Sequence, residues 1–215
     1  MVNRDLHPAP AEDLFRPVRG VVFDMDGTLV DSALDFELMR REMELPDGLP
    51  ILESIAGMND DDAHRCREIL HRHERDGGER AVVYPGVTDT LDWLDQRQIR
   101  RAVWTRNSRA VATATLSRLG LEFDRVVARE DAPAKPDPTA IAQLCDAWRI
   151  DCREVLMVGD YRFDIEAGRA AGARTALYTG GREPHECEGH ETADFHVRCY
   201  REVAALLERL GTAGS

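Results

Sequence analysis

The chain has 215 residues, of which 43% are hydrophobic and 32% are charged. At about 150 residues per domain, this length predicts one domain with an insertion, and the apolar content excludes a mainly disordered chain. Acidic residues outnumber basic ones by 40 to 28, so the formal net charge is −12. This balance disfavours nucleic acid as a partner, because binding by counterion release needs clustered positive charge. We see neither a run long enough to span a membrane nor a signal peptide, so we expect a cytoplasmic protein without a membrane partner.

The first strand is predicted just after a polar start. Residues 1–18 are interrupted by prolines, and we interpret them as an N-terminal extension. The apolar run Val21-Val22-Phe23 follows and leads into Asp24-Met25-Asp26-Gly27-Thr28. Such a run is typical of a parallel strand buried on both faces, and the glycine indicates a turn at its carboxyl end.

Residues 31–83 differ in character, because they have helical periodicity and no strand-like run until Val82. A first helix is interrupted by the Pro-Asp-Gly sequence at 46–48. A second, long helix follows Asn59 and is predicted to end at the glycine pair 77–78. We interpret this segment as a small helical cap inserted directly after the first strand.

From residue 84 onward, strands and helices alternate. The predicted strands are 101–104, 125–128, 155–158 and 175–177. The predicted helices are 87–98, 108–119, 138–148, 164–171 and 200–210. This alternation predicts right-handed βαβ units and a doubly wound, Rossmann-like parallel sheet, with an α/β core formed by residues 19–30 and 84–215.

Polar side chains that could together hold a divalent cation and a phosphoryl group follow four of the predicted strands. They are Asp24 and Asp26, Thr105, Lys135, and Asp160 with Asp164. Ligands of open parallel sheets bind where the strands end. Mg²⁺ selects carboxylate oxygens and usually takes only one or two carboxylates, so two of these aspartates suffice for it. Lys135 is the single lysine among 28 basic residues, which favours a site that needs a compact ammonium group.

Paired carboxylates also suit phosphoryl chemistry. One carboxylate can attack phosphorus to form an aspartyl-phosphate, and a second, two residues along, can protonate the leaving oxygen and later deprotonate water. A metal ion, a lysine and a hydroxyl donor would offset the charge of the attacked group.

At these positions the chain resembles the haloacid dehalogenase (HAD) superfamily. Asp24-Met25-Asp26-Gly27-Thr28-Leu29-Val30-Asp31-Ser32 resembles its first signature. Thr105, Lys135 and Gly159-Asp160-Tyr161-Arg162-Phe163-Asp164 are similar to the second, third and fourth, in that order. The resemblance extends from residue 19 to about residue 180.

This resemblance implies a role for each matched residue. Asp24 would be the nucleophile, and Asp26 the acid and base, with its backbone carbonyl facing the metal. The phosphoryl group would be bound by Thr105 and Lys135. Asp160 would ligate Mg²⁺ together with Asp24 and Asp26, and Asp164 would support that ligand or its water.

The resemblance also indicates a branch of the superfamily. An aspartate at position 26 points to phosphoryl transfer, because the dehalogenases lack it. The position of the insertion resembles the helical-cap group that includes the phosphoglycolate phosphatases. We therefore expect a Mg²⁺-dependent phosphatase acting on a small phosphomonoester. The alternatives are a sugar phosphomutase, which shares this aspartate, and a binding module that has lost the chemistry.

Some side chains have two interpretations. Asn107 could donate to the phosphate, and Arg106 could assist it or simply be exposed. Thr105 could cap a helix, although Ser108 can fill that role. His185, Cys187 and His190 lie close enough in sequence for a soft-metal site, but an ordinary loop has the same composition.

Overall fold

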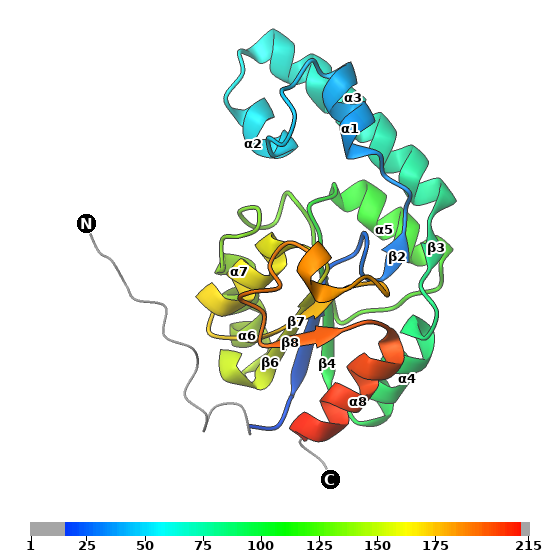
Figure 1. The fold of residues 1–215 in the computed structure, drawn as a ribbon, viewed down its shortest axis with the longest axis vertical. Helices are drawn as coiled ribbons and strands as arrows, with labels where there is room; N and C mark the ends of the chain where they lie inside the picture. The colour runs from blue at the N-terminus through cyan, green and yellow to red at the C-terminus, as the bar shows by residue number, and fades with distance from the viewer. Residues whose placement is uncertain (1–15, 212–215) are drawn as a thin grey trace, which may run out of the picture.

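The computed structural model describes residues 16–211, which form a central sheet with helices on both faces (Figure 1). All six strands are parallel and lie in the order β5-β4-β1-β6-β7-β8. The strands are β1 (Gly20–Phe23), β4 (Arg100–Trp104), β5 (Arg125–Val127), β6 (Val155–Gly159), β7 (Arg174–Tyr178) and β8 (Phe195–Val197). The chain builds outward on one side of β1 and then on the other. The predicted doubly wound α/β fold is therefore confirmed.

Alternate residues of each strand face opposite layers of helices. In β1, Phe23 packs in the apolar cluster of one face and Val22 in that of the other. One face is covered by α4 (Val87–Gln96), α5 (Arg109–Arg118) and α8 (Tyr200–Leu210). The other is covered by α6 (Thr139–Trp148) and α7 (Arg162–Ala170). Two short 3₁₀ helices are η2 (Cys152–Glu154) and η3 (Pro184–Glu186). Burial on both faces explains why the two middle strands, β1 and β6, are continuous apolar runs.

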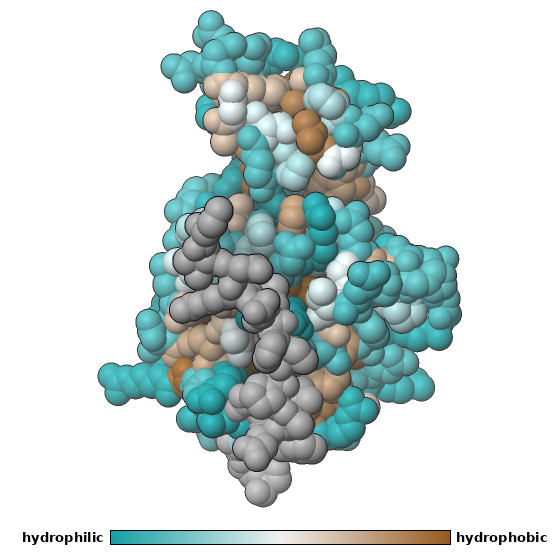
Figure 2. Space-filling view, turned by 60° about the vertical axis from the view of Figure 1, so that its left-hand side comes forward, coloured by the Kyte–Doolittle hydropathy of each residue, from teal (hydrophilic) through white to brown (hydrophobic). Residues whose placement is uncertain are grey.

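Helices α1 (Phe36–Glu42), α2 (Ile51–Ala56) and α3 (Asp60–Arg80) form a helical lobe beyond the body that contains the sheet (Figures 1 and 2). The helical lobe has its own small apolar cluster, formed by Met39, Met43, Ile51, Ile55, Ala63, Cys66 and Leu70. Its two connections to the body pair as short antiparallel strands, β2 (Val30–Asp31) and β3 (Val82–Val83). The segment expected to be helical thus leaves and rejoins the body at one place.

Helix α3 continues to Arg80, so the prediction that it ends at Gly77-Gly78 is wrong. The two glycines are buried inside the helix, where they permit close packing. A Cβ on Gly78 would overlap the Thr115 hydroxyl of α5, and one on Gly77 would overlap the Leu34 side chain. Glycine is used here for close approach of two helices, not for a turn.

Other differences are local. The short elements α2 and β8 were not predicted. Val18, which we placed in the extension, is fully buried and donates its backbone N–H to Gly211. Residues 1–15 of that expected extension lie outside the described residues. Within the described part of the chain, no helix is both long and apolar enough to cross a membrane.

Candidate active site

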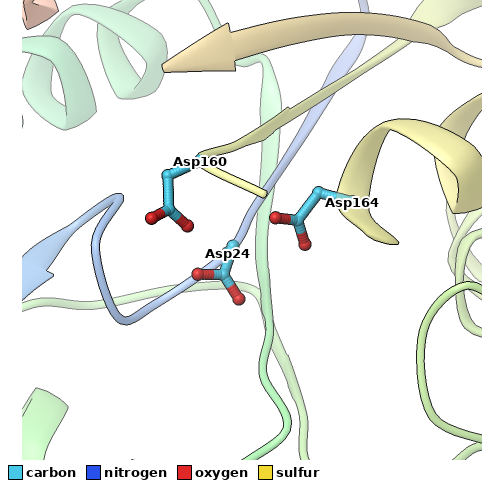
Figure 3. A group of neighbouring side chains, drawn as sticks. All are labelled: Asp24, Asp160 and Asp164. Atoms are coloured by element: carbon cyan, nitrogen blue, oxygen red, sulfur yellow. The ribbon is translucent and has the colours of Figure 1, made fainter. Parts of the chain in front are cut away.

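Three carboxylates meet at the edge of the sheet where the parallel strands end (Figure 3). Asp24 follows β1, Asp160 follows β6, and Asp164 lies in the first turn of α7. Oxygen atoms of the three groups lie within 4.8 Å of one another. Because β1 and β6 are hydrogen-bonded neighbours, residues far apart in the sequence arrive side by side.

A glycine makes room for this cluster. Gly27 has a φ of +81°, a backbone conformation that glycine adopts without strain. A Cβ at this position would overlap the carboxylate of Asp160. Any larger residue would therefore displace either the turn that follows β1 or the Asp160 side chain.

Lys135 is the cation of the cluster. Its side chain is 2% exposed, and Nζ lies 2.5 Å from Oδ1 of Asp24 and 2.7 Å from Oδ1 of Asp164. Burial alone would lower the pKa of Lys135, but the carboxylates of Asp164 and Asp24 outweigh burial and hold that pKa above its usual value. The single lysine of the chain is thus a charged group in the interior of the site.

One ammonium group does not balance three carboxylates. Burial raises the pKa of Asp24 well above its usual range, since the opposing effect of Lys135 is too small to cancel it. Burial, followed by the charge of Asp164, raises the pKa of Asp160 to about 7. Carboxylate oxygens that converge with excess negative charge fit a hard divalent cation such as Mg²⁺. The donor set therefore suits the expected ion.

Asp26 is held apart from this cluster by two hydrogen bonds. Ser32 donates from its hydroxyl to Oδ1 at 2.5 Å, and Asn107 donates from its side-chain amide to Oδ2 at 2.6 Å. Burial raises the pKa of Asp26, and these two hydrogen bonds oppose that shift. The carboxyl is thus fixed in position while being easier to protonate than an exposed aspartate.

The other predicted phosphate ligands lie on the loop after β4. Thr105 is buried, and its hydroxyl accepts a hydrogen bond from the backbone N–H of Asn107 at 3.1 Å. Ser108 caps α5, so Thr105 is not needed there. Arg106 forms an ion pair with Glu53 of α2, in which one guanidinium nitrogen, Nη2, lies 2.6 Å from each carboxylate oxygen. In this structure the Asn107 amide contacts Asp26, and Arg106 links the loop to the helical lobe.

Sequence reasoning missed several contacts around the site. Ser32 lies in the first signature, but nothing local indicates that its hydroxyl reaches Asp26. Tyr200 of α8 donates from its hydroxyl to the Thr28 carbonyl at 3.0 Å, across 172 residues of sequence. Glu74 could have been identified from the sequence, because it lies on the apolar face of α3. A carboxylate at such a position needs a partner.

The loop at 185–190 shows a different arrangement from a metal site. Cys187 is buried in a small apolar cluster, and a ring nitrogen of His190 lies 2.9 Å from the Cys187 carbonyl. Among residues 16–211, the one group of three ligating side chains that converges is Asp24, Asp160 and Asp164.

Comparison with known proteins agrees with this geometry. The sequence profile of a family described as haloacid dehalogenase-like hydrolase matches residues 21–178. The chain belongs to this family. A haloacid dehalogenase-like hydrolase domain-containing protein of Arabidopsis thaliana is 34% identical over 207 residues, which cover 89% of this chain and 84% of the relative.

Two bacterial relatives of this haloacid dehalogenase-like hydrolase are named for phosphatase activities. An N-acetylmuramic acid 6-phosphate phosphatase of Pseudomonas aeruginosa is 30% identical, with 89% of this chain and 96% of the relative covered. A phosphoglycolate phosphatase of Pseudomonas savastanoi is 32% identical, with 75% and 69% covered. The expected family, its phosphoglycolate phosphatase-like group and the class of phosphoric monoester hydrolase are confirmed.

Proposed function

We propose that this haloacid dehalogenase-like phosphatase hydrolyses small phosphorylated metabolites in the cytoplasm, with Mg²⁺ and through a phosphoryl group carried by Asp24. The main support is the arrangement of acids at the ends of β1 and β6. One carboxylate contacts a buried lysine beside two further carboxylates, while Asp26 is held separately by its own donors.

In the first step, a carboxylate oxygen of Asp24 attacks phosphorus, and the bond between phosphorus and the ester oxygen breaks. Asp26 gives its proton to that leaving oxygen. Lys135 and the hydroxyl of Thr105 offset the charge on the phosphoryl oxygens. The raised pKa of Asp26 favours this role, since burial makes the carboxyl easier to protonate than an exposed aspartate.

In the second step, Asp26 removes a proton from water as the water oxygen attacks the aspartyl-phosphate. The bond between phosphorus and the Asp24 oxygen breaks, which releases inorganic phosphate and restores both carboxyl groups. Asn107 and Ser32 keep Asp26 oriented in both steps, because they occupy one oxygen each.

Asp24, Asp160 and the backbone carbonyl of Asp26 would hold the Mg²⁺ ion. When bound, this ion would supply positive charge to the cluster and to the phosphoryl oxygens. Asp164 would support the site without ligating the ion. This assignment agrees with its contacts, since one oxygen lies 2.7 Å from Lys135 and the other accepts the Tyr161 N–H at 3.1 Å.

Residues 31–83 would act as a small cap beside the site, and residues 19–30 with 84–215 as the catalytic core. A small cap is supported by the apolar cluster of the described lobe residues, which has seven buried members. We expect it to leave space for substrates of different shape. The relatives with different named substrates support a phosphomonoester without favouring one leaving group.

The test is release of inorganic phosphate from a panel of phosphorylated metabolites, with Mg²⁺ and with a chelator. We expect Mg²⁺-dependent release that falls by at least about 10³-fold in Asp24→Asn. The matched control is Asp92→Asn, which alters an exposed acid on α4 and should keep the wild-type rate.

Four outcomes would contradict the proposal. Full activity in Asp24→Asn would exclude the nucleophile, and full activity with chelator would exclude the metal. Phosphoryl transfer that needs a bisphosphate and releases little phosphate would indicate a mutase. Binding of phosphate without turnover of any substrate would indicate a binding module.

A further inference from the structure

Helix α3 carries a buried acid that the proposed reaction does not use. Glu74 is 4% exposed, and it lies on the same helix face as the buried residues Cys66 and Leu70. Burial raises the pKa of Glu74, and Arg129 opposes that shift. A carboxylate in such a place is costly to bury unless it is paired with a cation.

The partner is Arg129, which follows β5 in the body. The guanidinium meets the carboxylate with two nitrogens, at 2.6 Å and 3.3 Å from its two oxygens. This two-pronged geometry fixes orientation as well as distance. The pair therefore connects the long helix of the helical lobe to the body.

The same two residues bind the loop after β4 at three consecutive positions. A side-chain nitrogen of Arg129 donates to the Arg106 carbonyl at 3.3 Å, and its backbone N–H donates to the Asn107 carbonyl at 3.0 Å. Glu74 accepts the backbone N–H of Ser108 at 3.5 Å. The loop that carries Thr105 and Asn107 is thus attached to the ion pair along its length.

This attachment continues to the reacting groups. Asn107 donates to Asp26 at 2.6 Å, so a shift of its backbone moves one of the two donors that orient that carboxyl. We propose that Glu74 and Arg129 are positioning residues, which act through Asn107 to fix Asp26 for proton transfer. The inference rests on the proposed function, because it assigns a purpose to the orientation of Asp26.

A simpler role, fastening α3 to the body, is already filled by other contacts. Arg118 of α5 donates to the carbonyls of Gly78 and Ala81 at 2.8 Å and 2.6 Å. The close approach of Gly78 to Thr115 adds to this attachment. Arg118 touches neither the loop after β4 nor Asp26 in any of these contacts, which makes it a matched control for anchoring alone.

The experiment is a double-mutant cycle of Glu74→Gln and Asn107→Ala, with kcat and KM measured on the best substrate of the panel. We expect Glu74→Gln to lower kcat about 10-fold and to change KM by less than about 2-fold, because the lost interaction serves the chemical step. The double variant should be no slower than Asn107→Ala, since residues that act through one another are not additive. Arg118→Met should lower the melting temperature and leave kcat unchanged.

The inference would be overturned if the losses of kcat in the two single variants multiplied in the double variant. It would also be overturned if Arg118→Met lost as much kcat as Glu74→Gln. If Glu74→Gln does not fold, Arg129→Lys replaces it, because lysine keeps the charge and loses the two-pronged contact.

Failure of the proposed function is distinguishable from failure of this inference. If the wild type releases no phosphate, amide hydrogen exchange at residues 106–108 decides the positioning role. Faster exchange in Glu74→Gln than in Arg118→Met would support it, and equal exchange would refute it.

Discussion

Charged side chains are arranged differently at the edge of the sheet, where the parallel strands end, and in the helical lobe. At the sheet edge, one lysine lies among three carboxylates. The carboxylates follow β1 and β6 or lie in the first turn of α7, and Lys135 lies in the loop between β5 and α6. In the helical lobe most charges are exposed. Some of them form pairs at the surface, such as Arg72 with Glu42 and Arg65 with Asp62. Glu74 is the exception, and it faces the body.

This difference indicates a division of tasks. The groups proposed to carry out the chemistry belong to the body, where Asp24 and Asp164 share one buried lysine. The helical lobe reaches them through a few polar contacts, chiefly those of Glu74 and Glu53. Substitutions at the sheet edge should therefore affect stability and turnover together, whereas those in the lobe should separate the two.

The largest effect is expected for Lys135→Met. Removing the ammonium group leaves Asp24 and Asp164 buried without a cation, which should lower the free energy of unfolding by about 3–5 kcal/mol at neutral pH. Turnover should be lost as well, because the phosphoryl charge is no longer offset. Chemical denaturation without added metal ion measures the first effect, and phosphate release the second.

Lys135→Arg is the matched variant for this test. It keeps the charge but must fit a planar guanidinium where the side chain is 2% exposed. We expect it to recover part of the stability and little of the activity. Wild-type stability in Lys135→Met would refute the view that the cluster depends on this one cation.

The sequence was most informative where the structure depends on local patterns. The middle strands β1 and β6 are buried on both faces and are continuous apolar runs, and the predicted polar residues are found at the ends of these strands. Ser108 was predicted as a cap from its position before an apolar helix, and its hydroxyl does accept the Val111 N–H. Such features need only a few neighbouring residues to be interpreted.

Contacts between distant segments could not be predicted in the same way. The bonds from Asn107 to Asp26 and from Arg129 to Glu74 join residues 81 and 55 positions apart, and they depend on how loops and helices pack. The glycine pair in α3 was misinterpreted because glycine serves both helix ends and close packing. The short strand β8 was not predicted, because its three residues, Phe-His-Val, form no continuous apolar run and only one of them is buried.

The charge of Asp160 should change the free energy of unfolding by an intermediate amount, and this effect should depend on pH. Its pKa is raised to about 7 in the folded protein, whereas an unfolded chain binds this proton only near the usual value of about 3.9. Between these values the folded state binds more protons, so its stability falls as pH rises. The penalty is complete above pH 7, where a bound cation would relieve it.

Without metal ion, Asp160→Asn should therefore be more stable than the wild type at pH 8, by about 1–3 kcal/mol, and should lose most of this advantage by pH 5. Added Mg²⁺ should stabilise the wild type more at pH 8 than at pH 5 and should stabilise the variant little. Thermal unfolding at both pH values, with and without Mg²⁺, measures this. The exposed-acid variant Asp92→Asn should follow the wild type throughout. If Asp160→Asn also responded to Mg²⁺ as the wild type does, Asp160 would be excluded as a ligand of the cation.

The smallest effect is expected for Glu53→Gln in the helical lobe. Glu53 forms an ion pair with Arg106, and their side chains are 46% and 26% exposed, respectively. Loss of such an exposed pair should change the free energy of unfolding by less than about 1 kcal/mol. The released guanidinium lies next to Thr105 and also contacts the Lys135 carbonyl at 3.3 Å. We expect kcat to stay within about 2-fold of the wild type, while KM falls for substrates with a second anionic group.

The comparison of KM across the substrate panel is the decisive measurement, because it separates substrate choice from chemistry. Glu68→Gln on α3 is the matched control, since it removes an exposed acid of the same helical lobe that no hydrogen bond or ion pair joins to the site. A KM that falls equally for singly and doubly charged substrates would point to general electrostatic attraction of anions. A loss of kcat as large as that of Glu74→Gln would show that α2, like α3, holds the reacting groups in place, and the division between the two regions would not hold.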